Sequence, residues 1–375
     1  MKVINLIVFL FILNIGLNAK YLDTKSCAEC HESIHYEHVN SMHHKSSLFK
    51  DEFHKKIKDI TTPDKYDCAL CHTPGANNLR ALMTGDEQPN PMNKQESDGV
   101  SCFYCHQITK VLITKHKNIN FYNYKADEKP KFFANLKDVY DTDKHKSNSG
   151  NEIYKNSQIC MGCHGKKYNK FGVQICSATD EKGMTSDCIG CHMPKFPGGA
   201  TKTNRKGREE YSSHEFLSIR DDDMVRKAVE LKLNLKEDNT LEISIKNKMG
   251  HAIIMQPMRL KYVETIVERD GNIVWKNYDK YPIEDEQATF TRLFKDDGDH
   301  RVFPPFATAI MYDNNIEANG TKVIHYALPK LQKGDTIRST WYSYVVRPSL
   351  ASTLKLENNE YTKRYTGVKV ELIVP

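Results

Sequence analysis

The sequence predicts an α+β protein, in which a loop-rich, mainly helical N-terminal domain precedes a C-terminal antiparallel β-sandwich. Three observations lead to this prediction. The chain has 375 residues, which is long enough for two domains with hydrophobic cores. All eleven cysteines lie before residue 192, among polar segments rich in turn-forming residues. After about residue 220, apolar and polar residues alternate in several runs, and this two-residue period is typical of half-buried strands.

The first residues, MKVINLIVFLFILNIGLNAK, predict a secretory signal peptide over residues 1–19. Lys2 precedes an apolar run from Val3 to Leu13, and the small residue Ala19 is a suitable cleavage point. The run is shorter than the about 20 apolar residues that a membrane-spanning helix needs, although an uncleaved anchor is the alternative. We therefore expect an exported protein of the periplasm, with domains at residues 20–219 and 220–375.

Ten of the eleven cysteines belong to five copies of the pattern C-x-x-C-H. This pattern is typical of c-type haem attachment, in which two thiols bind the porphyrin covalently and the histidine binds the iron. The sequence therefore predicts five covalently bound haem c groups. The motifs are Cys27/Cys30/His31, Cys68/Cys71/His72, Cys102/Cys105/His106, Cys160/Cys163/His164 and Cys188/Cys191/His192.

Two other uses of the cysteines fit the pattern less well. A zinc ribbon needs four thiolates from two C-x-x-C pairs, and no histidine is required directly after each pair. A disulfide framework, which is common in exported proteins, requires no histidine at all. Five repeats with the same histidine position favour haem. Large apolar macrocycles would also supply the core that this polar half lacks, so we expect it to fold poorly without them.

Short helices around each motif, joined by loops, are expected in the N-terminal half. The segment GDEQPNPMNKQESDG, residues 85–99, is one such loop because it is rich in turn formers. The boundary with the C-terminal half is placed at the acidic, unpatterned segment IRDDDM, residues 219–224.

Seven or eight strands are expected in the C-terminal half. The turn KEDN separates the first two runs, and Asp270-Gly271 precedes another. Short alternating strands between turns predict a sandwich. The runs are VELKLNL (229–235), LEISIK (241–246), YVETIVE (262–268), NIVWKN (272–277), KVIHYAL (322–328), TIRSTWYSYVV (336–346) and VKVELIVP (368–375).

The charge of the chain argues against a nucleic-acid partner. The formal net charge is +6, but lysine and arginine are scattered along the chain and acidic residues are nearly as abundant. Proteins that bind polyanions usually gather their basic residues on one segment or face. We expect no nucleic acid among the partners.

The motifs and their surroundings resemble the tetrahaem cytochromes c of nitrifying bacteria and their multihaem relatives, a group that includes hydroxylamine oxidoreductase. The resemblance is carried by YLDTKSCAECHESIHYEHVNSMHHKS, GVSCFYCHQI, CMGCHG and GVQICSATDEKGMTSDCIGCHMPKFPG. SSHEF and IKNKMGHAIIMQPMR resemble a β domain appended to such cytochromes. The chain departs from the pentahaem nitrite reductases, whose catalytic haem is typically bound through C-x-x-C-K, because all five motifs here end in histidine.

This resemblance implies distal iron ligands among the remaining eleven histidines. His43, in a Ser-Met-His segment, is the first candidate. His145, fifteen residues before the fourth motif, is the next, and His214 and His251 follow. If His251 reaches a haem, the β-sandwich caps the haem domain, whereas the alternative for His251 is an ordinary turn residue.

The other histidines are expected to be non-ligands or are left open. His54, in DEFHKKIK, is expected on a solvated helix face, and His116 in a solvated loop. His35 could lie beside a haem or bind it. His38, His44, His300 and His325 are expected to be non-ligands. Met42, Met249 and Met255 remain alternative axial ligands, although methionine more often fills gaps in a core.

Cys176 is the one cysteine outside the motifs. A thiolate ligand or a reactive group beside a haem is one interpretation. We favour a small buried apolar residue, because free cysteine is among the most buried residue types.

The sequence leaves two functions open. The first is a periplasmic carrier of electrons in an anaerobic or microaerobic respiratory chain, which exchanges them with a quinol dehydrogenase or a terminal reductase. Its contact with the membrane would then be through such a partner. The second is a multihaem reductase or oxidase of small nitrogen or sulfur compounds with one five-coordinate haem. The many spare histidines favour the carrier, because an iron with two axial ligands has no open position for substrate.

Overall fold

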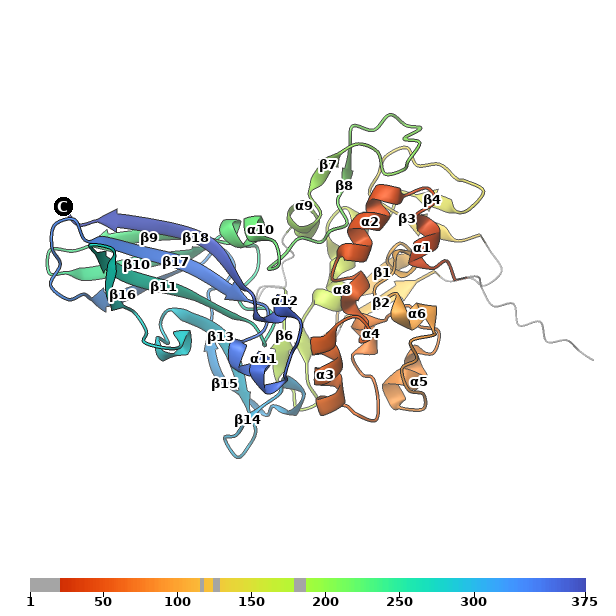
Figure 1. Cartoon of the computed structure of the whole chain (residues 1–375). Helices are drawn as coiled ribbons and strands as arrows, with labels where there is room; N and C mark the ends of the chain where they lie inside the picture. The colour runs from red at the N-terminus through yellow and green to blue at the C-terminus, as the bar shows by residue number, and fades with distance from the viewer. Residues whose placement is uncertain (1–20, 115–117, 124–128, 179–186) are drawn as a thin grey trace, which may run out of the picture.

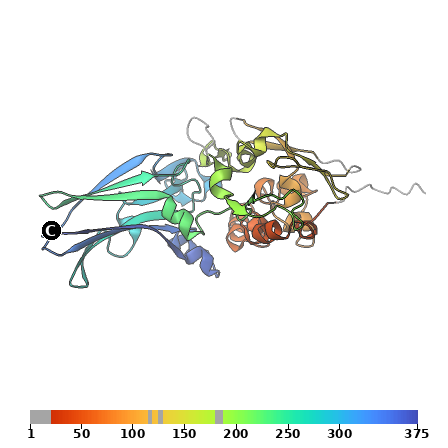
Figure 2. The same cartoon turned by 90° about the horizontal axis from the view of Figure 1, so that it is seen from above.

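The computed structural model describes residues 21–114, 118–123, 129–178 and 187–375. The predicted signal peptide and His116 lie outside the described residues. Two regions lie side by side: short helices occupy the right of Figure 1 and long strands the left, and the view from above in Figure 2 shows the same division. Within the described residues, no helix has both the length and the apolar character needed to cross a membrane.

Short helices dominate the first hundred described residues, and four of the eight begin at a side chain that accepts a hydrogen bond from the first turn. Ser101, for example, accepts from the amide of Tyr104, and such caps satisfy amides that have no partner inside the helix. The elements are α1 (Thr24–Cys27), α2 (Glu32–Asn40), the 3₁₀-helix η1 (His44–Ser46), α3 (Glu52–Thr61), α4 (Ala69–His72), α5 (Leu79–Thr84), α6 (Lys94–Ser97) and α7 (Cys102–Cys105).

Four two-stranded ribbons, which were not predicted, connect the later helices of this half. The pairs β1-β2, β5-β6 and β7-β8 are antiparallel, and β3-β4 is parallel. The strands are β1 (Ile108–Leu112), β2 (Ile119–Tyr122), β3 (Lys131–Phe133), β4 (Lys146–Asn148), β5 (Lys167–Tyr168), β6 (Gln174–Cys176), β7 (Lys195–Pro197) and β8 (Glu210–Ser212). The helices among them are η2 (Glu152–Tyr154), η3 (Gln158–Cys160), α8 (Met161–His164) and α9 (Cys188–His192).

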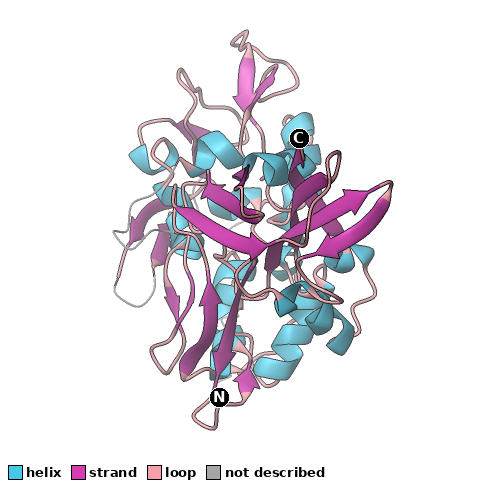
Figure 3. Ribbon diagram, turned by 90° about the vertical axis from the view of Figure 1, so that its left-hand side faces the viewer, coloured by secondary structure: helices cyan, strands magenta, loops and turns pink. Residues whose placement is uncertain are grey.

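The C-terminal half contains two antiparallel sheets, as predicted. One has three strands in the order β16-β10-β9, and the other has seven, with a central path β14-β13-β11-β17-β18. Figure 3 shows these strands from the sandwich end. They are β9 (Val229–Leu235), β10 (Thr240–Asn247), β11 (Leu260–Arg269), β12 (Asn272–Lys276), β13 (Thr289–Lys295), β14 (Arg301–Val302), β15 (Ala309–Asn314), β16 (Thr321–Ala327), β17 (Thr336–Tyr344) and β18 (Arg364–Ile373).

Several short helices accompany these strands. They are α10 (Asp222–Lys227), η4 (Pro282–Glu284), η5 (Pro304–Phe306), α11 (Pro348–Thr353) and α12 (Asn359–Thr362). The segment expected to be an unpatterned boundary therefore contains α10, whose first turn is capped by the Asp221 side chain. The division of the chain near residue 220 stays a proposal.

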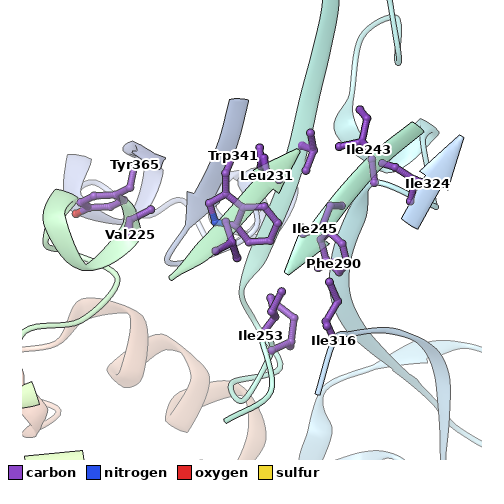
Figure 4. Packing of buried hydrophobic residues seen from close by; sticks show 14 of the residues in the cluster. Val225, Leu231, Ile243, Ile245, Ile253, Phe290, Ile316, Ile324, Trp341 and Tyr365 are labelled. Atoms are coloured by element: carbon purple, nitrogen blue, oxygen red, sulfur yellow. The ribbon is translucent and has the colours of Figure 1, made fainter. Parts of the chain in front are cut away.

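The alternation read from the sequence places the apolar side chains between the two sheets. Leu241, Ile243 and Ile245 of β10 are fully buried and pack with Phe290 and Trp341 of the facing sheet (Figure 4). The predicted turn between β9 and β10 ends at an asparagine with positive φ, a conformation that asparagine tolerates. All seven predicted runs form strands. The structure adds β13, β14 and β15, so the half has ten strands rather than seven or eight.

Helix α3 joins the two halves, beside α11 and α12 (Figure 1). Lys56 donates from its ammonium to the carbonyls of Leu354 and Lys355, at 2.8 and 2.6 Å. Phe53 and Ile57 pack against the hydrophobic core of the sandwich. The sandwich is therefore held against the helical half by both polar and apolar contacts.

Removing buried volume from β10 should destabilise the sandwich. Ile243 is fully buried, so Ile243→Ala should lower the free energy of unfolding by about 2–5 kcal/mol through lost packing and the cavity that remains. Ile273 of β12 is 59% exposed, and Ile273→Ala should stay within about 0.5 kcal/mol of the parent. Urea unfolding followed by tryptophan fluorescence measures both, because the two tryptophans lie in this half. Equal losses in the two variants would contradict the described core.

Candidate haem sites

A single cavity runs through the N-terminal half and reaches the sandwich. Its volume is about 2330 Å³, more than twice the roughly 1,000 Å³ at the upper end of ordinary ligand pockets. All five motifs line it, so the residues predicted to hold haem from five separate segments meet in one space. The lining includes Cys27, Cys30, His31, Cys68, Cys71, His72, Cys102, Cys105, His106, Cys160, Cys163, His164, Cys188, Cys191 and His192.

The local fold explains why each motif presents its side chains together. At the first three motifs, the amide of the histidine donates to the carbonyl of the first cysteine, at 2.9, 3.1 and 3.0 Å for His31, His72 and His106. These bonds close one helical turn. Residues i, i+3 and i+4 share one face of a helix, so both thiols and the imidazole of a C-x-x-C-H turn point to the same side.

Backbone carbonyls orient four of the five motif imidazoles. A carbonyl oxygen can only accept a hydrogen bond, so Nδ1 carries the proton and Nε2 keeps a free lone pair for a metal. No residue type in the sequence points to these acceptors, because they are backbone atoms of distant segments. The pairs are His31 with Ala200 at 2.6 Å, His72 with Ser46 at 3.1 Å, His106 with Phe133 at 2.7 Å and His192 with Leu217 at 2.5 Å.

Four motif histidines face a second imidazole across the cavity. An imidazole nitrogen lies about 2 Å from a bound metal, so two imidazoles on opposite sides of one iron have ring centroids about 6 Å apart once half of each ring is added. The observed separations fit this requirement. They are 6.3 Å for His31–His145, 6.0 Å for His106–His214, 6.0 Å for His164–His43 and 6.4 Å for His192–His251.

The second imidazoles are the four histidines singled out as distal candidates. Three of them also use Nδ1 toward a carbonyl: His145 toward Lys146 at 3.3 Å, His214 toward Ser212 at 2.9 Å and His251 toward Ala252 at 2.8 Å. Their Nε2 atoms are thereby left for the cavity. Burial lowers the pKa of His214 to about 3 and that of His251 to about 4, which favours the neutral form that a metal requires.

The remaining motif histidine, His72 of the second motif, lies beside His54. The arrangement of these two rings differs from that of the other four pairs. Their centroids are 3.8 Å apart, and both Nδ1 atoms lie near the carbonyl of Ser46, at 3.0 and 3.1 Å. This separation is shorter than that of two imidazoles on opposite sides of an iron. Nε2 of His54 is buried and has no hydrogen-bond partner among the described residues.

The expectation that His54 lies on a solvated helix face was wrong. His54 is only 7% exposed, and Lys58 and Thr61 on the same side of α3 are buried as well. The signal was present in the sequence, since positions 54, 57, 58 and 61 have the spacing of one helix face. The lysines of DEFHKKIK masked it, because the stem of Lys58 is buried while its ammonium reaches the carbonyl of Pro63 at 2.8 Å.

The remaining histidines lie in several different surroundings. Nε2 of His38 lies 2.9 Å from the carbonyl of Val100, so the nitrogen that would bind iron is already used. Nε2 of His44 accepts from the ammonium of Lys50 at 2.7 Å. His300 and His325 are exposed on the sandwich. His35, Met42, Met249 and Met255 line the cavity, and the first of these continues the helix of the first motif.

Contacts between thiols show which motifs are neighbours. The thiol of Cys27 of the first motif lies close enough to that of Cys102 of the third to interact with it, and the same holds for Cys71 of the second and Cys163 of the fourth. The thiols of Cys160 of the fourth motif and Cys188 of the fifth are also close enough to interact, and Cys105 lies close enough to the fourth motif to interact electrostatically with it. The motifs are therefore connected in the spatial order first, third, fourth, with the second and the fifth both beside the fourth.

Cys176 lines the same cavity from β6. Burial raises the pKa of its thiol to about 11, which keeps the sulfur protonated and poorly nucleophilic at neutral pH. The residue is half-buried at the cavity wall rather than fully buried, and its raised pKa argues against a reactive thiolate.

Removal of one facing imidazole should change the spin state of one haem and leave the other haems unchanged. His43→Ala should convert one low-spin haem to high spin, because the strong-field nitrogen opposite His164 is removed. Electron paramagnetic resonance of the oxidised protein measures this change. The control is His300→Ala, on the exposed surface of the sandwich, which should leave the spectrum unchanged. Identical spectra for the two variants would show that His43 binds no iron.

The chain and its structure are similar to known proteins. The family described as "Cytochrome c554 and c-prime" matches residues 26–107, which contain the first three motifs. The structure is similar to that of a penta-heme cytochrome c552 from Thermochromatium tepidum, with a TM-score of 0.76 and 21% sequence identity over 94% of this chain and 99% of that chain. No curated protein matches the sequence. The structural likeness shows the fold alone, and the family match over the first three motifs supports a c-type cytochrome with covalently bound haem.

Proposed function

We propose that the protein is a periplasmic pentahaem cytochrome c that carries electrons in an anaerobic or microaerobic respiratory chain. The observation that carries the proposal is the set of four imidazole pairs with centroids 6.0 to 6.4 Å apart. Bound haem supplies one-electron exchange, and an iron with imidazoles on both sides has no position left for a substrate. Its redox partner would be a quinol dehydrogenase or a terminal reductase. The protein would be associated with the membrane through this partner.

The order of the motifs supports a relay rather than five isolated centres. Thiols of the first and third motifs lie close enough to interact, and so do those of the second and fourth and of the fourth and fifth. Because the cysteines are the attachment points, porphyrins fixed there would lie edge to edge around the fourth motif. We place the protein closer to the tetrahaem carriers of nitrifying bacteria than to the pentahaem nitrite reductases. The reason is that all five motifs end in histidine, whereas the catalytic haem of those reductases is typically bound through C-x-x-C-K.

A second function is favoured by one site. The rings of His72 and His54 are 3.8 Å apart, which differs from the other four pairs. A haem at the second motif would keep one face open if His54 stays beside His72 instead of crossing to the far side. His54 would then stand close to an open iron position, as in a multihaem reductase or oxidase of small nitrogen or sulfur compounds.

The haem count tests the number of sites. Fully matured protein should contain five haems per chain, measured by the pyridine haemochrome assay. The double variant Cys68→Ala/Cys71→Ala should contain four, since both thioether positions of the second motif are lost. Cys176→Ser is the matched control and should keep five, because Cys176 lies outside the motifs. A count of four in the parent protein would remove one motif from the proposal.

Carbon monoxide binding separates the carrier from the enzyme. The reduced carrier should bind no carbon monoxide, and His54→Ala should bind one equivalent if His54 is an axial ligand of the second site. Binding of one equivalent by the parent protein, unchanged in His54→Ala, would overturn the carrier and favour the enzyme. His38→Gln is the control, because Nε2 of His38 is already bonded to the Val100 carbonyl and its loss should not open an iron.

A further inference from the structure

Two basic residues of the sandwich face the haem cavity at the start of β11. Arg259 and Lys261 both line the cavity, together with His192 and His251. Lys261 is only 8% exposed, and its ammonium donates to the carbonyl of Ile253 at 2.9 Å. That carbonyl lies two residues after His251, so the positive charge of Lys261 is held close to the His192–His251 pair.

Neither cation has a negative partner in the described part of the chain. Among the described residues, no Asp or Glu acts electrostatically on either side chain: Arg220 and Cys176 act on Arg259, and Arg259 acts on Lys261. Both cations act on His251, and Arg259 also acts on His164. Burial and, secondly, the neighbouring charge of Arg259 lower the pKa of Lys261 to about 7. Buried charges in proteins are normally paired, so this arrangement calls for an anion supplied by something other than the protein chain.

We propose that Arg259 and Lys261 bind the propionate carboxylates of the haem held between His192 and His251. The inference rests on the proposed function, which places a haem there. Each haem carries two negatively charged carboxylates. The two cations equal them in number and carry the opposite charge. The planar guanidinium can bind a carboxylate through two parallel hydrogen bonds, and the ammonium acts as a compact point charge.

The pairing gives the sandwich a role in setting a redox potential, beyond supplying His251. A positive charge near the iron favours the reduced state, which carries one more electron. Neutralising the two carboxylates acts in the same direction, because it removes negative charge from the edge of the porphyrin. The cations should therefore raise the potential of this haem relative to the other haems.

Potentials measured by spectroelectrochemistry on the complete five-haem protein test the proposal. Lys261→Met keeps the length of the side chain and removes its charge. It should shift the oxidation equilibrium of one haem about tenfold toward the oxidised form, which equals a fall of 59 mV for one electron. Arg259→Gln should shift the same haem in the same direction, and the double variant should shift it further.

The matched control is Lys322→Met. Lys322 is a partly buried lysine of the same sandwich that donates to Asn314 at 2.6 Å, and it does not line the cavity. It should leave all potentials unchanged. Resonance Raman spectra should show the propionate bending bands shifted in the Lys261 and Arg259 variants alone.

The outcomes separate this proposal from the function on which it rests. If His251→Ala leaves every haem low-spin, His251 is not an axial ligand and the proposed haem between His192 and His251 is not bound in that position. If His251→Ala gives a high-spin haem but Lys261→Met and Arg259→Gln leave all potentials and propionate bands unchanged, the haem is present and the propionate assignment is wrong. Added sulfate should have no effect on the parent protein. A sulfate-dependent shift that disappears in Lys261→Met would instead assign the cations to a small free anion.

Discussion

The pairing of imidazoles from distant parts of the chain is the constraint on which the rest of the structure depends. His31 pairs with His145, His106 with His214, and His192 with His251. Each pair joins a motif to a segment that local structure alone would leave free. The N-terminal half has short helices, small ribbons and little aliphatic core, so fixed distances between its loops have to come from such links. The 6 Å spacing is the geometric requirement that those loops satisfy.

The fold was predictable from the sequence where a short-range pattern determines it. Alternation in VELKLNL and LEISIK was enough to place β9 and β10, because residues of one face recur every second position. The run containing Thr289–Lys295 was missed because both of its faces are buried at the start, with Phe290 on one face and the polar residues Thr289 and Thr291 on the other, so that no apolar-polar alternation marks it. The small ribbons of the first half were missed because strands of two to five residues are too short to show a clear period.

The residues of the candidate site also divide into those that a local pattern predicts and those that only the tertiary structure brings together. The ten cysteines and five motif histidines follow from spacing along the chain, which is a local property. Facing partners are a tertiary property, and the resemblance to known cytochromes suggested His43, His145, His214 and His251. His54 shows where this reasoning failed, because lysines on its helix concealed a buried face. The carbonyls of Ala200, Ser46 and Leu217, which fix the imidazole tautomers, leave no trace in the identity of a side chain.

The loop that carries His251 has a consequence for the order in which the structure can be completed. Asn247 holds this loop by donating to the carbonyls of His251, Ile316 and Glu317, at 2.8, 3.1 and 2.9 Å. The amide of Ile253 donates to the same Ile316 carbonyl at 3.0 Å. The second imidazole of the last motif is thus held by residues more than sixty positions further along the chain. During synthesis from the N-terminus, four motifs can find their partners within the first half, while the fifth has to wait for the sandwich to close.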